Sequence, residues 1–350
     1  MFKKKPKSFL GVDLGAGGIK VVEIEKLKGR PRLLTYGYTE RSPKLVETSI
    51  LDDKKTGETL SKICKKAGAK SNNAIAGLSI SSVFSSLITV APTSEEELKT
   101  AVEAQARKLL SYPVEEAVLD WKVLDSEEGQ GKLQRVLLTA APKELINKYV
   151  EVFKVAKLNL LYLETEAFAL VRSLVGKDKS SVAIVDIGAA KTNILIVEAG
   201  IPIVTRSINV GGVMITKEFS EKMKINIEEA ENLKKDMKNT TGANDQEVKI
   251  SKPIELLLTP VINEIRYSIN LYLKENKDGN VGRKIEKIIL TGGTALFPQL
   301  VGYFSQMLKV KVFVGNPWAR VLYPNELRTD LDELGSRFSV AIGLAVRDIE

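Results

Sequence analysis

Two aspartates in the sequence stand in closely similar settings, each at the end of a short apolar run and just before a turn of small residues. The two settings are Val12-Asp-Leu-Gly-Ala-Gly-Gly-Ile-Lys20 and Val185-Asp-Ile-Gly-Ala-Ala-Lys-Thr-Asn193. Glycine permits positive φ and lets a ligand approach backbone N–H groups, which together form a cavity for an anion. Asp13 and Lys20 add opposite charges. This combination suits a polyphosphate held with a divalent metal, although aspartate is also an ordinary residue at the start of a turn.

The composition narrows the chemistry further. The 350 residues include no histidine and one cysteine, Cys64, which excludes His-based acid–base catalysis, Ser-His-Asp triads, intrachain disulfides and structural zinc sites. Any metal must then be a hard ion bound by oxygen, such as Mg²⁺. Cys64 itself is expected to be buried and inert on a helix face.

The net charge of +8 owes much to the N-terminus, where four lysines lie within the first seven residues. Such a tail could touch anionic lipid or nucleic acid, but a solvated terminus is the favoured interpretation, and no motif supports nucleic-acid binding. No apolar run reaches the ~18 residues of a membrane helix, and the basic start leads into a strand rather than into a secretory signal. These features, with the single cysteine, favour a cytoplasmic protein.

Each aspartate is expected to lie in a hairpin that a third strand extends. The strands are predicted at 10–12, 20–25 and 32–38 around the first aspartate, and at 181–187, 194–198 and 203–208 around the second. Such an internal repeat in a chain of 350 residues predicts two related α/β domains that face each other.

A block at 84–158 interrupts the first of these domains. Its elements are expected in the order strand, helix, strand, strand, helix, which makes a compact α+β insertion of ~75 residues. Ser94 and Glu97 have the spacing of a capping box at the start of the first helix, and Leu109 is assigned to its buried face. Val150 is assigned to the buried face of the second helix.

Further signals lie after the inserted block. A third glycine turn, Gly292–Gly293, follows a predicted strand, and a long amphipathic helix is predicted over Pro260–Leu273. Two segments rich in small residues, Glu166–Leu170 and Val340–Ala345, are predicted to be helices that cross at a hinge between the two halves.

In this order the three glycine turns and two small-residue helices resemble the five motifs, phosphate 1, connect 1, phosphate 2, adenosine and connect 2, of the superfamily of actin, heat-shock-protein-70 and sugar-kinase ATPases. Within it the chain is most similar to bacterial FtsA-type proteins and to the PilM family of type IV pilus assembly proteins. The inserted block and the stretches Leu138-Thr-Ala-Ala-Pro142 and Leu163-Glu-Thr-Glu-Ala-Phe-Ala-Leu-Val-Arg172 carry this likeness. It covers the whole chain and implies an α/β, actin-like (ribonuclease H-like) fold of two lobes, with ATP in the cleft and an inserted α+β subdomain 1C.

The resemblance also implies a division into four subdomains. Subdomain 1A would comprise residues 1–83, 159–178 and 334–350, subdomain 1C residues 84–158, subdomain 2A residues 179–213 and 259–333, and subdomain 2B residues 214–258. Partner docking is assigned to subdomain 1C.

Roles in the site transfer from the resemblance residue by residue. Asp13 and Asp186 would hold Mg²⁺ from the two lobes, largely through water, and Lys20 would neutralise the β-phosphate of ATP. Glu231 would reach the ribose, and Glu166 would orient an attacking water. The residues implied to bind ATP are Asp13, Gly15, Ala16, Gly17, Gly18, Lys20, Asp186, Gly188, Lys191, Thr192, Asn193, Gly211, Gly212, Glu231, Lys234, Gly292, Gly293, Thr294 and Leu296.

One departure from the superfamily pattern limits the expected activity. Asn193 stands where a second aspartate is often found, and alanines occupy positions of the preceding turn where many of these ATPases have glycine. The expectation is therefore slow ATP turnover at most, in a chain that serves mainly as a nucleotide-dependent scaffold.

The resemblance to the PilM family implies a place in the inner-membrane platform that assembles type IV pili. The implied partner is the short cytoplasmic N-terminal peptide of PilN, bound in a groove between subdomains 1A and 1C, with other pilus assembly proteins and self-association left open. The chain stops at Glu350, soon after connect 2, without the membrane helix of FtsA. It is therefore expected to be cytoplasmic and to reach the inner membrane only through partners.

Two other functions stay open. The first is a filament-forming, FtsA- or MreB-like cytoskeletal ATPase. The second, less favoured, is a small-molecule kinase, which usually needs an acidic general base near a substrate pocket; no such base is evident.

Overall fold

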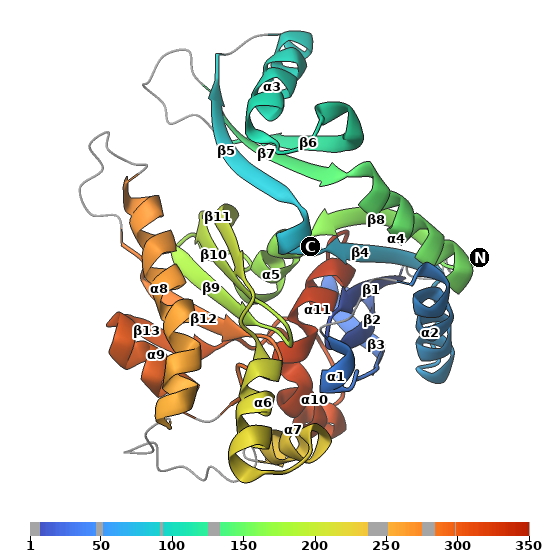
Figure 1. The fold of residues 1–350 in the computed structure, drawn as a ribbon. Coiled ribbons are helices and arrows are strands. Elements are labelled where there is room, and N and C mark those ends of the chain that lie inside the picture. The colour runs from blue at the N-terminus through green and yellow to red at the C-terminus, as the bar shows by residue number, and fades with distance from the viewer. Residues whose placement is uncertain are drawn as a thin grey trace.

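Two five-stranded sheets with the same pattern of strands form the frame of the molecule (Figure 1). The structure is a computed structural model that describes residues 8–46, 52–91, 94–124, 134–236, 251–274, 284–297 and 299–349. In each sheet, three antiparallel strands are extended by two parallel strands, in the orders β3-β2-β1-β4-β8 and β11-β10-β9-β12-β13. The predicted internal repeat and the two-lobed α/β fold are thereby confirmed.

The first hairpin of each sheet has an aspartate at the same position of its strand pairing. The first sheet consists of β1 (Ser8–Gly15), β2 (Gly18–Leu27), β3 (Arg30–Tyr38), β4 (Asn73–Leu78) and β8 (Asn159–Thr165). The second consists of β9 (Val182–Ile187), β10 (Thr192–Glu198), β11 (Ile201–Ile208), β12 (Lys287–Thr291) and β13 (Lys311–Val314). Asp13 lies opposite Lys20 in the β1–β2 pair, and Asp186 lies opposite Asn193 in the β9–β10 pair. The register therefore gives both lobes a carboxylate at the same point.

Two buried helices, α5 (Glu166–Leu174) and α11 (Ser339–Ala345), cross between the lobes, as predicted. Their apolar side chains belong to one core that both sheets share. A Cβ on Gly343 would lie 2.5 Å from the carbonyl carbon of Ala169, so the approach of the two helices needs glycine at this position. On the other side of α11, a Cβ on Gly11 of β1 would lie 2.6 Å from the backbone nitrogen of Ala345.

The opposite face of the first sheet is covered by α2 (Asp53–Lys66) and α4 (Lys143–Ala156), which lie side by side. Helix α4 was assigned to the inserted block, but it packs on α2 and on the core of the first sheet. The subdomain boundaries themselves stay a prediction. The assignment of Val150 to the buried face is wrong, because its side chain is exposed while the neighbouring Val152 and Phe153 are buried.

The inserted block forms a separate three-stranded sheet that projects from the first lobe (Figure 1). The strands lie in the order β5-β7-β6, and helix α3 covers this sheet. The elements are β5 (Phe84–Val90), α3 (Glu95–Leu109), β6 (Ala117–Val123) and β7 (Gln134–Pro142). The capping box of Ser94 and Glu97 is confirmed. Val102 and Ala106 form the buried face of α3, whereas Leu109, at the last turn, is exposed, contrary to the prediction.

The remaining helices surround the second sheet and the entrance to the space between the lobes. They are α1 (Pro43–Val46), α6 (Gly212–Met223), α7 (Ile227–Asp236), α8 (Lys252–Lys274), α9 (Leu300–Leu308) and α10 (Arg328–Leu334). Helix α8 begins well before Pro260 and runs through it, because Ile254 and Leu258 are buried in the core of the second lobe. Among the described helices, none is long and apolar enough to cross a membrane.

Candidate functional site

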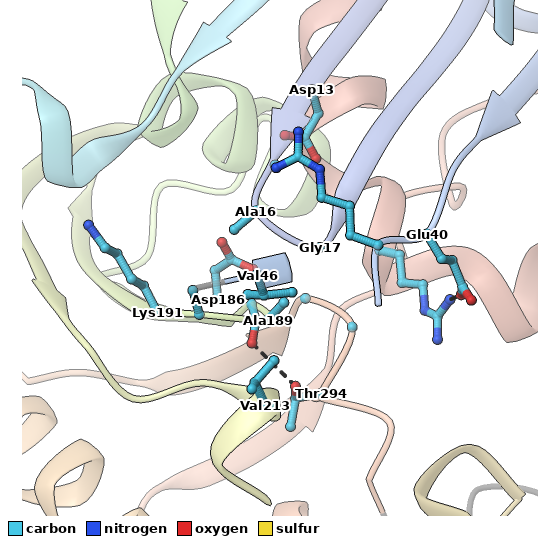
Figure 2. Close-up of a pocket in the computed structure, with 18 of the residues that line it drawn as sticks. Asp13, Ala16, Gly17, Glu40, Val46, Asp186, Ala189, Lys191, Val213 and Thr294 are labelled. Atoms are coloured by element: carbon cyan, nitrogen blue, oxygen red, sulfur yellow. Dashed lines mark hydrogen bonds and ion pairs between the residues drawn. The ribbon is translucent and has the colours of Figure 1, made fainter. Parts of the chain in front are cut away.

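A cavity of about 880 Å³ lies between the two lobes. The turns that follow β1, β9 and β12 line it, and Figure 2 shows Asp13 and Asp186 directed into the same space. The sequence-predicted site residues on its wall are Asp13, Gly15, Ala16, Gly17, Lys20, Glu166, Asp186, Gly188, Lys191, Asn193, Gly212, Glu231, Lys234, Gly292, Gly293 and Thr294. Residues that are distant in the sequence thus meet at one place.

Four predicted site residues do not line the cavity: Gly18, Thr192, Gly211 and Leu296. The Thr192 hydroxyl is fully buried and donates to the carbonyl oxygen of Val210 at 2.6 Å. Gly18 has a φ of +136°, and its Cβ would lie 2.8 Å from the carbonyl carbon of Thr39. Thr192 and Gly18 therefore support the turns from behind, and none of the four residues lies on the wall of the cavity.

Three glycines of the site have backbone N–H groups that are already hydrogen-bonded within the protein. The N–H groups of Gly188, Gly212 and Gly292 already donate to the carbonyl oxygens of Lys191, Gly188 and Ser336, at 2.9, 2.9 and 3.1 Å. A Cβ on Gly17 would lie 3.0 Å from the Ala189 methyl group, so the glycine turns of the two lobes approach each other here. The turn after β1 is therefore the better candidate for phosphate N–H contacts.

Three carboxylates lie deep in the cavity. The Lys20 ammonium donates to Asp13 at 2.9 Å, and the Asn193 amide donates to Asp186 at 3.3 Å. Burial, followed by the charges of Asp13 and Asp186, raises the pKa of Glu166 to about 8. Burial and the charge of Asp13 raise the pKa of Asp186 to about 6. The three groups repel one another as anions, so a bound cation would be favoured among them.

Replacement of Glu166 by glutamine is expected to reduce the pH dependence of stability. The folded-state pKa of about 8 lies above the usual 4.5, so the stability that Glu166 contributes is fully present below pH 4.5 and is lost as the pH rises through about 8. The variant should melt about 2–4 °C higher than the wild type at pH 8.5, with a smaller difference at pH 5. Thermal denaturation without ligand at both pH values measures this. Glu103→Gln on α3 is the matched control, and an equal shift for Glu166→Gln at both pH values would contradict the prediction.

The buried ammonium group of Lys234, on α7, lines one side of the cavity. Lys234 donates to Glu231 at 2.6 Å, to the Thr216 hydroxyl at 2.7 Å and to the carbonyl oxygen of Gly212 at 3.1 Å. Burial lowers the pKa of Lys234, against the charge and hydrogen bond of Glu231. The predicted pair of Glu231 and Lys234 is therefore a fixed polar network, and a hydroxyl or ring nitrogen of a ligand would find ordered donors and acceptors beside it.

Sequence reasoning missed the segment at 39–46, which crosses the entrance of the cavity. Glu40 accepts hydrogen bonds at 2.6 Å from both Lys235 of α7 and Arg337, and Lys44 pairs with Glu228 of α7 at 3.0 Å. Burial would raise the pKa of Glu40, but the bonds from Lys235 and Arg337 together hold it below its usual value. The segment therefore ties the first lobe to the second.

The same segment is attached to the first glycine turn. The N–H of Arg41 donates to the carbonyl oxygen of Gly17 at 3.0 Å, and the Thr39 hydroxyl accepts from the N–H of Ile19 at 3.1 Å. A ligand that displaces the turn would therefore act on the contacts with α7 as well. No motif marks this segment in the sequence, since its partners are brought together only by the fold.

Two lobes with repeated sheets, small-residue crossing helices and a cavity lined by glycine turns from both lobes define a protein of the actin-like class. A family model for the type IV pilus assembly protein PilM matches residues 11–349. The chain belongs to this family.

Similar proteins agree with this assignment. The cell division protein FtsA of Bacillus subtilis (strain 168) is 21% identical over an alignment 350 positions long. The alignment covers 88% of this chain and 78% of FtsA. A solved structure described as a PilM-PilN type IV pilus biogenesis complex has a TM-score of 0.83 and 23% identity, covering 97% of this chain and 98% of that chain. The structure of MreB5 of Spiroplasma citri bound to ADP has a TM-score of 0.51 and 17% identity, and the match covers 96% of this chain and 94% of MreB5. At these identities the solved structures show a shared fold.

Proposed function

We propose that the cavity binds ATP together with Mg²⁺. The observation that carries this proposal is the repeated register, which directs Asp13 and Asp186 into one space from the two lobes. Mg²⁺ is commonly held by one or two carboxylates, with water and phosphate oxygens as its other ligands. Within the described residues, no three Asp, Glu, Cys or His side chains gather closely enough to hold a metal alone. The two carboxylates therefore fit a metal that arrives with a phosphate.

The protein's own groups then have distinct roles. Lys20 would turn from Asp13 to a phosphate oxygen, and Glu231 would accept hydrogen bonds from the ribose hydroxyls. Bound Mg²⁺ would supply neutralisation of the phosphate charge. Glu166 would orient an attacking water, and bound Mg²⁺ would offset the Asp13 and Asp186 charges that, after burial, raise the pKa of Glu166 to about 8 without ligand. Asn193 in place of an acid favours slow hydrolysis and a nucleotide that acts mainly as a structural ligand.

We further propose that the chain is a cytoplasmic member of a type IV pilus platform and binds the cytoplasmic N-terminal peptide of a PilN-type membrane protein. Support comes from the family membership and from the likeness, over 97% of this chain, to the PilM-PilN complex. The peptide would lie between the first lobe and the inserted sheet. In that region β8 is the outer strand of the first sheet, and its Leu161 and Tyr162 side chains are exposed. An extended peptide can add to such an edge and cover apolar side chains.

A synthetic peptide of this kind is expected to bind the full chain with a dissociation constant of about 1–50 μM, measured by fluorescence anisotropy. Leu161→Asp should weaken binding about tenfold or more, because it places a charge where an apolar contact forms. Leu256→Asp on α8, where the leucine is 62% exposed, is the matched control and should change nothing. Absence of binding would contradict the partner, whereas binding that Leu161→Asp leaves intact would contradict the position of the groove.

A filament-forming role has weaker support. MreB5 of Spiroplasma citri matches with a TM-score of 0.51, against 0.83 for the PilM-PilN complex. Sedimentation with and without ATP separates the two functions, since ATP-dependent filaments would sediment and a scaffold would stay in solution.

A further inference from the structure

One end of the first lobe carries exposed basic residues on the β2–β3 turn, on α2 and the segment before β4, and on α4 and the segment before β8. This is the end at which the parallel strands β1, β4 and β8 begin, opposite the cavity. We call it the basic end. Its residues, all exposed, are Lys26, Lys28, Arg30, Lys62, Lys65, Lys66, Lys70, Lys154 and Lys157.

Hydrogen bonds between the strand starts show that these segments lie together. The Ser71 hydroxyl donates to the carbonyl oxygen of Ser8 at 2.8 Å, and the N–H of Asn159 donates to the carbonyl oxygen of Asn72 at 2.7 Å. Ser8 also pairs with Glu25, near the turn between β2 and β3. Helices α2 and α4 lie side by side, and each ends just before its parallel strand. Their last turns therefore reach the same end as the β2–β3 turn.

The carboxylates of this end do not balance its positive charge at the surface. Glu23 is 1% exposed and accepts from the backbone N–H of Lys70 at 2.8 Å. Glu25 is also buried and pairs with Arg32, while the exposed Glu151 pairs with Lys154 at 3.1 Å. In the part of the chain that the structure describes, no ion pair involves the other eight residues of the basic end. On these segments Glu151, and Glu58 one turn before Lys62, are exposed acidic residues, so positive charge outnumbers negative here, whereas surfaces normally intersperse both signs evenly.

Helix dipoles explain only part of this distribution. Lysines in the last turn of a helix are favoured by the partial negative charge there, which accounts for Lys65 and Lys66. Lys26, Lys28 and Arg30 lie on strands and their turn, where no dipole favours them. Four more lysines precede Ser8 directly in the sequence.

We propose that the basic end binds the surface of a bilayer that contains anionic phospholipid. The charges are spread over an end formed by turns and helix termini, and within the described stretches 26–30, 62–70 and 154–157 that carry them there is no exposed aromatic ring on which a base could stack. Such an array suits a dense layer of anionic headgroups, where each lysine adds to the attraction over a Debye length. The contact would add direct lipid binding to the expected link through a partner, and it would leave the cavity facing away from the membrane.

Co-sedimentation of the full chain with vesicles tests the proposal. The wild type should bind vesicles with roughly one third phosphatidylglycerol and not vesicles of phosphatidylcholine alone, and raising salt from about 0.05 to about 0.3 M should release it. The triple variant Lys62→Gln, Lys65→Gln, Lys66→Gln should bind about tenfold or more weakly. The triple variant Lys26→Gln, Lys28→Gln, Arg30→Gln, on a different element, should have a similar effect.

The matched control is Lys99→Gln, Lys108→Gln, Lys122→Gln, which removes the same charge from exposed positions of the inserted block. Its binding should stay within about twofold of the wild type. The proposal is overturned if the wild type ignores anionic vesicles at low salt, or if the control loses as much binding as the test variants. It is also overturned if duplex DNA binds more tightly than the vesicles and depends on the same lysines. None of these outcomes requires nucleotide or peptide binding, so the result is independent of the proposed function.

Discussion

Replacement of Gly343 by valine is expected to leave the chain largely unfolded or aggregated. The new side chain would begin 2.5 Å from the carbonyl carbon and 2.8 Å from the Cα of Ala169, both of them backbone atoms of α5 that cannot rotate away. Helix α11 is buried along its whole length between the two sheets, so moving it would open the core that the lobes share. We expect a loss of more than about 3 kcal/mol in the free energy of unfolding, because overpacking here cannot be relieved by a change of rotamer.

Soluble yield and thermal denaturation followed by circular dichroism measure this effect. Gly302→Val in α9 is the matched control, since a Cβ on Gly302 would meet nothing within 4 Å. The control should fold as the wild type does, because valine has a better helix propensity than glycine. A Gly343→Val protein that melts within about 2 °C of the wild type would show that α5 and α11 do not approach as closely as described.

The parts of the fold that sequence reasoning predicted correctly are those with local signals. Each aspartate hairpin is specified by an apolar run, a glycine turn and a second apolar run, so its strands and register follow from neighbouring residues. The repeat of this pattern then predicted the second lobe. Small residues in Val340–Ala345 predicted a close helix crossing, because such residues are used where backbones must approach.

Features that depend on distant residues were not predicted. Glu40 reaches Lys235, 195 residues away, and Arg337, 297 residues away, so nothing near Glu40 in the sequence indicates either contact. The raised pKa of Glu166 likewise depends on its burial in the folded protein and on the approach of Asp13 and Asp186 from other strands. The start of α8 was misplaced because Pro260 was taken as its beginning, whereas burial of Ile254 and Leu258 extends the helix beyond it.

Replacement of Asp13 by alanine is expected to reduce the affinity for ATP in the presence of Mg²⁺ by about a hundredfold or more. The side chain is 8% exposed at the base of the cavity and is the carboxylate of the first lobe nearest the glycine turn. Asp13 and Asp186 are the two residues proposed to hold the metal, directly or through water. Without Asp13, only Asp186 would remain. Lys20, whose side chain is 19% exposed, would also lose its ion-pair partner at 2.9 Å.

Calorimetric titration with ATP, in Mg²⁺ and again in a chelator, isolates the role of the metal. Asp13→Asn keeps an acceptor for Lys20 but removes the charge, so it should lose the Mg²⁺-dependent part of the affinity with less effect on stability. Asp120→Ala, at an exposed position of β6, is the control and should bind as the wild type does. Equal affinities of the wild type and both Asp13 variants in Mg²⁺ would contradict the metal role. The repeated register would then reflect only how the two lobes arose and pack, because its most direct chemical consequence would be missing.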